Sequence, residues 1–171
     1  MIIDLSDIIK DYGGKMNVSA SVEMNEVDFL GESFIFQKPL TVNGTIQNNT
    51  KSLEFTAKAE GEMLVRCARC QKPITVPVKF RINEVLAGED NDLTDEDIIV
   101  FSGEEIDISE IVVNSFLMNV SAKYLCSEDC KGLCMKCGAD LNEGDCGCDN
   151  TEIDPRWADL QEIMKNMTDT E

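Results

Sequence analysis

The stretch Cys126-Ser-Glu-Asp-Cys130-Lys-Gly-Leu-Cys134-Met-Lys-Cys137-Gly138 places four cysteines within a short run of chain, and Cys146 and Cys148 follow closely. Four glycines between positions 132 and 147 make sharp backbone turns easy in this segment. The segment contains too few large apolar side chains to build a hydrophobic core of its own. Something other than apolar packing must therefore hold residues 126–148 together.

Cysteine pairs supply that alternative. Two residues between two thiolates let the backbone form a knuckle that points both sulfur atoms at one ion, and zinc takes four such ligands at tetrahedral corners. Four pairs give two closed, structural sites, and the loop-closure entropy favours partners that are close in sequence. We expect one site from Cys134, Cys137, Cys146 and Cys148, and a second from Cys67, Cys70, Cys126 and Cys130. Iron or an iron–sulfur cluster, dithiol redox chemistry, inert thiols and disulfides remain open alternatives.

The composition excludes several classes of function. The chain has 171 residues, of which 43% are hydrophobic, so it can bury a core in one domain with a small appendage. A formal net charge of −18 argues against electrostatic binding of nucleic acid or an anionic membrane over a broad surface. The absence of histidine from the sequence excludes a Ser-His-Asp triad, a Cys-His dyad and any imidazole metal ligand. We expect no catalytic residues, no enzyme activity and no small-molecule substrate.

The beginning of the chain predicts its compartment. Asp4, Asp7 and Asp11 do not fit a basic and apolar signal peptide. No apolar run approaches the ~18–20 residues needed to span a bilayer. We therefore expect a cytoplasmic protein without a membrane partner, and a reducing compartment favours metal over disulfides.

Residues 16–82 read as an antiparallel arrangement of strands. Positions 16–24 alternate between apolar and polar side chains, and Phe34 and Phe36 suggest another short strand. Residues 40–46 and 53–59 flank a turn at 48–51, and residues 62–67 and 74–82 flank the first cysteine pair. We expect an antiparallel β meander or small barrel, with the first cysteine pair at a hairpin tip.

The rest of the chain adds helices around that sheet. Residues 88–97 form an acidic segment that we interpret as a solvated loop, and residues 98–101 are a possible last strand. Asp107 followed three residues later by Glu110 predicts an N-cap and a helix over about 108–120 that packs on the sheet. Asp154-Pro155 predicts a C-terminal helix whose apolar face docks on the core or on a partner. The predicted class is α+β, with a β domain over 1–125 and a zinc-binding segment with the C-terminal helix over 126–171.

A small cluster of basic residues contrasts with the acidic composition. Residues 63–83 contain no Asp or Glu, and the basic residues there are Arg66, Arg69, Lys72, Lys79 and Arg81. They either balance nearby thiolates and acids or form an electropositive patch that contacts RNA phosphates. Both interpretations stay open from the sequence alone.

Several motifs together resemble one family. They are Cys67-x-Arg-Cys70, Ile106-Asp107-Ile108, the stretch 125–138, Asp140-Leu141-Asn142, Cys146-x-Cys148 and Ile153-Asp-Pro-Arg-Trp-Ala-x-Leu160. In this order they are similar to the YceD family of large ribosomal RNA subunit accumulation proteins. The chain departs from the pattern at Ser121, where a proline is expected, and at Gln71, where leucine is usual.

The resemblance implies a process rather than a reaction. It implies a non-enzymatic factor that supports accumulation or processing of the large-subunit (23S) rRNA and assembly of the ribosome, with Zn²⁺ as a structural cofactor. The implied partners are rRNA or the pre-ribosomal large subunit, with basic ribosomal proteins as further candidates for the acidic surface. The alternative is a redox-responsive thiol and zinc chaperone, because closely spaced cysteines can release zinc on oxidation.

Overall fold

The computed structural model describes residues 1–89 and 98–149. The chain divides into two compact units, which we call the β unit (residues 1–67 and 72–126) and the cysteine-rich unit (residues 68–71 and 127 onward). Most of the acidic loop and the C-terminal helix predicted after Asp154 fall outside the described residues.

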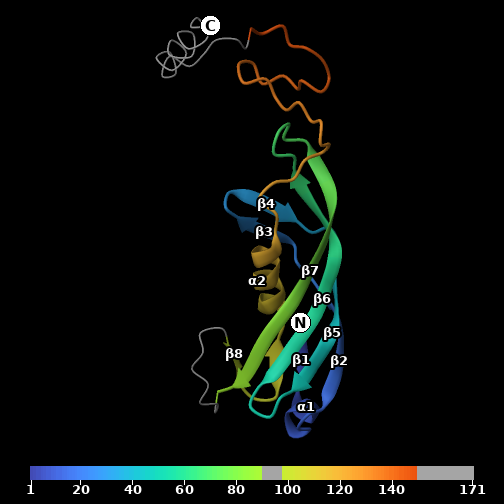
Figure 1. Cartoon of the computed structure of the whole chain (residues 1–171), viewed down its shortest axis with the longest axis vertical. Coiled ribbons are helices and arrows are strands. Elements are labelled where there is room, and N and C mark those ends of the chain that lie inside the picture. Colours follow the sequence, from blue (N-terminus) through green and yellow to red (C-terminus); the bar gives the residue numbers. More distant parts are fainter. Residues whose placement is uncertain (90–97, 150–171) are drawn as a thin grey trace, which may run out of the picture. The chain divides into compact units, whose positions relative to one another are not determined.

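The β unit contains all of the named helices and strands (Figure 1). In chain order they are β1 (Ile2–Asp4), α1 (Ser6–Lys10), β2 (Lys15–Val22), β3 (Glu26–Phe29), β4 (Glu32–Ile35), β5 (Leu40–Asn48), β6 (Leu53–Arg66), β7 (Pro73–Gly88), β8 (Ile98–Phe101), β9 (Glu105–Asp107) and α2 (Ser109–Asn119).

A seven-stranded sheet organises this unit. β2, β5, β6 and β7 pair in that order, all antiparallel, and β4 joins β6 while pairing with β3. β8 runs parallel to the end of β7, and β1 pairs with β9 in a separate two-stranded ladder. The described residues thus form a mostly antiparallel sheet with two helices, which is compatible with the predicted α+β class. The barrel alternative is wrong, because the described strands form an open sheet.

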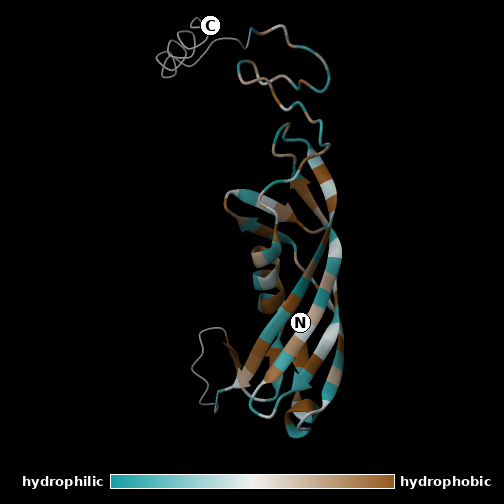
Figure 2. Cartoon of the chain, in the orientation of Figure 1, coloured by the Kyte–Doolittle hydropathy of each residue, from teal (hydrophilic) through white to brown (hydrophobic). Residues whose placement is uncertain are grey.

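Alternation of side chains gives the sheet one buried and one exposed face. In β2, the odd-numbered residues are exposed while Val18, Ala20 and Val22 are buried. β6 follows the same rule with its odd-numbered positions inward, so Phe55, Ala57 and Ala59 lie in the core. Figure 2 shows the result as alternating bands along the strands. This period of two is the pattern of a sheet that packs on one side and meets water on the other.

Helix α2 covers the buried face near β4 and β7 (Figure 1). The Phe116 ring is fully buried and meets Phe34 and Phe36 edge-on, with ring centroids 5.5 and 5.2 Å away, and Phe80 at 6.0 Å. The helix prediction over about 108–120 is close, but the cap differs. Ile108 occupies the N-cap position, and the Asp107 carboxylate instead accepts a hydrogen bond from the Ser109 N–H at 2.9 Å.

β6 is one strand where the sequence suggests two. The glycine at position 61 interrupts the apolar pattern, yet Gly61 pairs with Val78 in the middle of the ladder. A Cβ atom there would lie 2.4 Å from Cδ2 of Leu40, which is itself fully buried. Glycine at this position therefore allows β5 and its core leucine to approach closely, and it does not end the strand.

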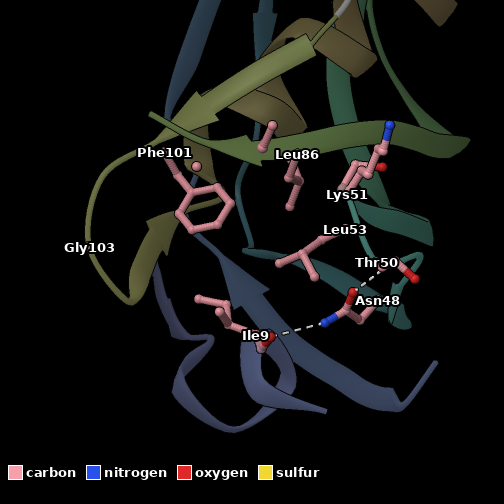
Figure 3. A pocket seen from close by; sticks show the side chains of 11 residues that line it. Ile9, Asn48, Thr50, Lys51, Leu53, Leu86, Phe101 and Gly103 are labelled. Carbon is pink, nitrogen blue, oxygen red and sulfur yellow. Dashed lines mark hydrogen bonds between the residues drawn. The ribbon is translucent and has the colours of Figure 1, made fainter. Parts of the chain in front are cut away.

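Asn48 fixes α1 to the end of β5 (Figure 3). Its buried Nδ2 donates hydrogen bonds to the carbonyl oxygens of Ile8 and Ile9 at 2.8 and 3.1 Å, and its Oδ1 accepts one from the Thr50 N–H at 2.8 Å. The side chain thus caps the end of the short helix, because it satisfies the Ile9 carbonyl and adds a second donor to the Ile8 carbonyl, which also accepts from the Asp11 N–H at 3.3 Å.

Candidate metal centres

The structure brings the eight cysteines into two groups of four. One group contains Cys134, Cys137, Cys146 and Cys148, and the other contains Cys67, Cys70, Cys126 and Cys130. Within each group the sulfur atoms all lie within 4.8 Å of one another. Two groups of four close cysteines are what the spacing of the pairs predicts.

Sulfur atoms within this limit are close enough for a tetrahedral thiolate site. Four sulfur atoms about 2.3 Å from a central ion are about 3.8 Å from each other. Zinc and iron both accept four thiolates in this geometry. None of the eight cysteines, all of which lie in the described residues, is assigned to a disulfide, so each group offers four sulfur atoms to an ion. The four donor atoms of each group therefore could hold a metal ion.

The cysteine-rich unit forms a small hydrogen-bonded frame around Cys134. The Cys134 N–H donates to the Ala139 carbonyl and the Gly138 N–H donates back to the Cys134 carbonyl, both at 2.8 Å. Gly138 has a φ of +74°, a backbone conformation that is strained for a residue with a side chain. Leu133 bridges to Asp140 across the turn. This frame is the knuckle that the sequence predicts.

Hydrogen bonds within the same backbone turn shift the pKa values of the thiols in this group. The backbone N–H groups of Cys137 and Lys136, followed by the Cys146 side chain, lower the pKa of Cys134 to about 6. The neighbouring sulfur atoms, with Cys137 first, raise the pKa of Cys148 to about 12. The donors thus stabilise one thiolate, while further thiolates repel each other until a cation compensates their charge.

The second group combines residues that are far apart in sequence. Cys67 follows β6 directly, and its N–H donates to the Lys72 carbonyl at 2.9 Å. The Cys67 sulfur accepts a hydrogen bond from the Cys126 N–H at 3.4 Å. The Cys130 sulfur accepts one from Nδ2 of Asn142 at 3.5 Å. Such N–H donors disperse negative charge on thiolate ligands.

Asn142 is a supporting residue that the cysteine spacing alone does not reveal. Besides Cys130, it contacts Lys131, whose N–H donates to Oδ1 at 2.8 Å, and Asp140, whose Oδ1 accepts from the Asn142 N–H at 2.9 Å. Its only sequence signal is its place in the Asp140-Leu-Asn142 motif.

The five basic residues of the predicted patch belong to different parts of the structure. Arg69 lies in the cysteine-rich unit, where its Nη1 donates to the carbonyls of Glu128 and Cys130 at 3.1 and 2.7 Å. The other four belong to the β unit. Lys79 and Arg81 point outward from β7, and Arg66 ends β6. Lys72 lies just before β7 and is exposed. The structure therefore brings Lys79 and Arg81 onto one face and gives Arg69 a bracing role.

A hollow of about 240 Å³ lies where β5, β7 and β8 end (Figure 3). Its lining is largely apolar, from Ile9, Leu53, Leu86 and Phe101, and Lys51 is the one titratable side chain among its lining residues. The amide of Asn48 beside it is engaged with Ile8, Ile9 and Thr50. The lining of this hollow offers no pair of acid and base groups for catalysis.

A comparison with known families finds a match over most of the chain. The family model described as "Large ribosomal RNA subunit accumulation protein YceD" matches residues 55–164. This range contains all eight cysteines and runs from β6 through α2. No helix in the described ranges is both long and apolar enough to cross a membrane.

Individual bacterial proteins are also similar to the chain. The chain is 28% identical over 150 residues to the uncharacterized protein YlbN of Bacillus subtilis, covering 85% of this chain and 86% of that protein. It is 28% identical over 129 residues to the uncharacterized protein Rv2926c of Mycobacterium tuberculosis, covering 73% of this chain and 62% of the relative.

A plant protein carries a descriptive name. It is the "Large ribosomal RNA subunit accumulation protein YCED homolog 1, chloroplastic" of Arabidopsis thaliana, 35% identical over 78 residues, which are 44% of this chain and 24% of the plant protein. No solved structure matches the chain significantly. On the strength of the family match over residues 55–164, this chain belongs to the YceD family of large ribosomal RNA subunit accumulation proteins.

Proposed function

We propose that this protein is a non-enzymatic factor that supports accumulation and processing of the large-subunit rRNA during ribosome assembly. The observation that carries the proposal is the family match, which spans the long β6–β7 hairpin, α2 and both cysteine groups. The Arabidopsis relative carries the same description in its name. A compartment that contains ribosomes, such as the cytoplasm, suits this role.

The proposed role of the cysteines is to hold Zn²⁺ as a structural element. Cys134, Cys137, Cys146 and Cys148 would ligate one ion, and Cys67, Cys70, Cys126 and Cys130 a second. A bound ion supplies the folding free energy that a segment without a core lacks, roughly 10–16 kcal/mol in small zinc modules. The fit of the sulfur separations to a tetrahedral site supports this proposal.

The proposed partners are rRNA or the pre-ribosomal large subunit. Arg66, Lys72, Lys79 and Arg81 are the candidates for phosphate contacts from the β unit, with Arg69 acting by bracing its own loop. A hollow of about 590 Å³ in the cysteine-rich unit supports an additional contact there, because Arg69, Lys131 and Lys136 line it and no acidic residue does. The acidic remainder of the surface suits basic ribosomal proteins.

One observation favours a second candidate, a redox-responsive thiol and zinc chaperone. The pKa of Cys134 lies near 6, and a low thiol pKa is a condition for rapid oxidation. The same N–H donors, however, also stabilise thiolates that ligate a structural metal. The family match gives the rRNA role the stronger support.

Depletion of the protein tests the rRNA role. We expect a strain that lacks it to lose mature large-subunit rRNA and large subunits while small-subunit rRNA stays at its normal level. The wild-type chain should restore the large-subunit rRNA. Quantitative northern blots and sucrose-gradient profiles measure both. Normal large-subunit rRNA in the depleted strain would contradict the proposed function.

A further inference from the structure

Two cations face each other directly on the exposed side of the sheet. Lys58 of β6 and Arg81 of β7 are register partners in the antiparallel ladder. Both lie at outward, exposed positions of their strands. Side chains directly opposite in such a ladder have Cβ atoms about 4.5–5.5 Å apart, so the two cationic side chains start from neighbouring points on the sheet.

This arrangement is unfavourable for folding by itself. Like charges directly opposite each other destabilise a sheet. Within the described residues, no ion pair relieves either Lys58 or Arg81. The nearest acid along β6 is Glu60, and its carboxylate lies 3.4 Å from Nζ of Lys79 in a pair of its own. Lys58 and Arg81 therefore retain uncompensated positive charge.

The Glu60–Lys79 ion pair lies in the row on one side of Lys58 and Arg81, and the other outward neighbours of these two residues are polar and uncharged. The same row continues across β5 and β2 to Asn43 and Ser19, which hydrogen-bond to each other at 2.8 Å. In the adjacent row, Oγ1 of Thr56 donates to Oδ1 of Asn83 at 3.2 Å. Hydroxyl and amide groups of this kind hydrogen-bond to phosphate oxygens and sugar hydroxyls.

The charge of this face differs from that of the chain. The outward positions of β2, β5, β6 and β7 carry five basic and three acidic side chains. The whole chain has a net charge of −18. Exposed cations concentrated on one polar face of an acidic protein match a polyanionic partner in charge and in hydrogen-bonding groups.

We propose that Lys58 and Arg81, with Lys79 beside them, bind the phosphate backbone of an RNA strand on the outer face of the sheet. The proposal rests on the proposed function and names its contact surface. Arginine donates two parallel hydrogen bonds to a phosphate, and lysine adds a point charge. A phosphate between Lys58 and Arg81 removes the repulsion that the folded protein otherwise contains.

The test uses the full chain with the double variant Lys58→Gln, Arg81→Gln. The matched control is Lys10→Gln, Lys38→Gln, which removes the same charge at two exposed lysines that are paired with Glu104 and Glu62. The probe is a fluorescent fragment of large-subunit rRNA, titrated over a series of salt concentrations. A polyglutamate peptide is the second probe.

We expect the Lys58/Arg81 variant to bind the RNA at least about tenfold more weakly, with a salt slope smaller by about 2. Its melting temperature should rise by about 1–3 °C, because the like-charge pair is gone. The control should bind RNA within twofold of wild type, and Lys58→Arg should retain the wild-type affinity. If the double variant is more stable and yet binds RNA more weakly, the loss of binding is not caused by damage to the fold, so the two residues contact the RNA.

Three results overturn the proposal: unchanged RNA affinity in the Lys58/Arg81 variant, an equal loss in the control, or a loss of polyglutamate binding with RNA binding intact. The last result assigns the face to an acidic protein. None of these affects the rRNA levels of the depleted strain, so the proposed function stands or falls on that separate measurement.

Discussion

A Cys134→Ser substitution should remove metal from the local site and unfold the knuckle of the cysteine-rich unit. The serine hydroxyl is a far weaker zinc ligand than a thiolate, and no described residue of this unit belongs to the buried apolar cluster that could replace the lost binding energy. The amides of Cys134, Gly138 and Leu141 report the change, because each donates to a backbone carbonyl within this unit. Their hydrogen exchange should accelerate by on the order of a hundredfold or more.

The matched control is Met135→Ser, in the same knuckle. The Met135 side chain is 98% exposed and belongs to neither cysteine group, so this variant should keep the wild-type exchange rates. Amides in the centre of β6 should stay protected in both variants, since they belong to the β unit with its own core. Unchanged protection at Cys134, Gly138 and Leu141 in the Cys134→Ser variant would show that the knuckle does not depend on this ligand.

A Phe116→Ala substitution should destabilise the β unit by about 3–5 kcal/mol. The Phe116 ring is fully buried between the rings of Phe34, Phe36 and Phe80, so its removal leaves a cavity where α2 packs on the sheet. Urea unfolding followed by far-ultraviolet circular dichroism measures the loss. On the same helix, Met118 is 87% exposed, and Met118→Ala should change the stability by less than about 0.5 kcal/mol.

One result would contradict the claim that the aromatic contacts of Phe116 hold α2 on the sheet. If Phe116→Ala costs less than about 1 kcal/mol, or no more than Met118→Ala, the aromatic contacts do not hold α2 on the sheet. A cost of that size is typical of an exposed or easily repacked side chain.

The sequence predicts the parts of the fold that have strong local signals. Alternation over residues 16–24 predicts which side chains face the core, and the structure buries Val18, Ala20 and Val22 of β2 and Met24 just after that strand. The apolar spacing after Asp107 predicts α2 within one or two residues at each end. These segments are predictable because burial of one face imposes a period that a single segment reveals.

Elements that depend on distant partners are not predictable in this way. β1 and β9 are three residues long, and each exists because Ile2–Asp4 pairs with residues 105–107 from much later in the chain. The direction of β8 also depends on its partner, since it runs parallel to the end of β7. Short segments like these carry no period, and long-range pairing overrides local propensity.

The same difference between local and long-range structure decides which candidate sites can be predicted from the sequence. Cysteine spacing predicts two groups of four close sulfur atoms, because the knuckle is a local structure with fixed requirements. The opposition of Lys58 and Arg81 depends on the register of the β6–β7 ladder, and the two residues are 23 positions apart. The basic cluster identified along the sequence, over residues 63–83, therefore includes Arg81 but not Lys58.

The central claim is that metal ions hold the cysteine-rich unit together, and native mass spectrometry of the full chain tests it most directly. Protein purified without added metal or chelator should carry two zinc ions per chain, and Cys134→Ser should carry one. A strong chelator should remove the ions and the protection of the Cys134, Gly138 and Leu141 amides together. Metal-free protein whose knuckle amides remain protected in the chelator would contradict the claim.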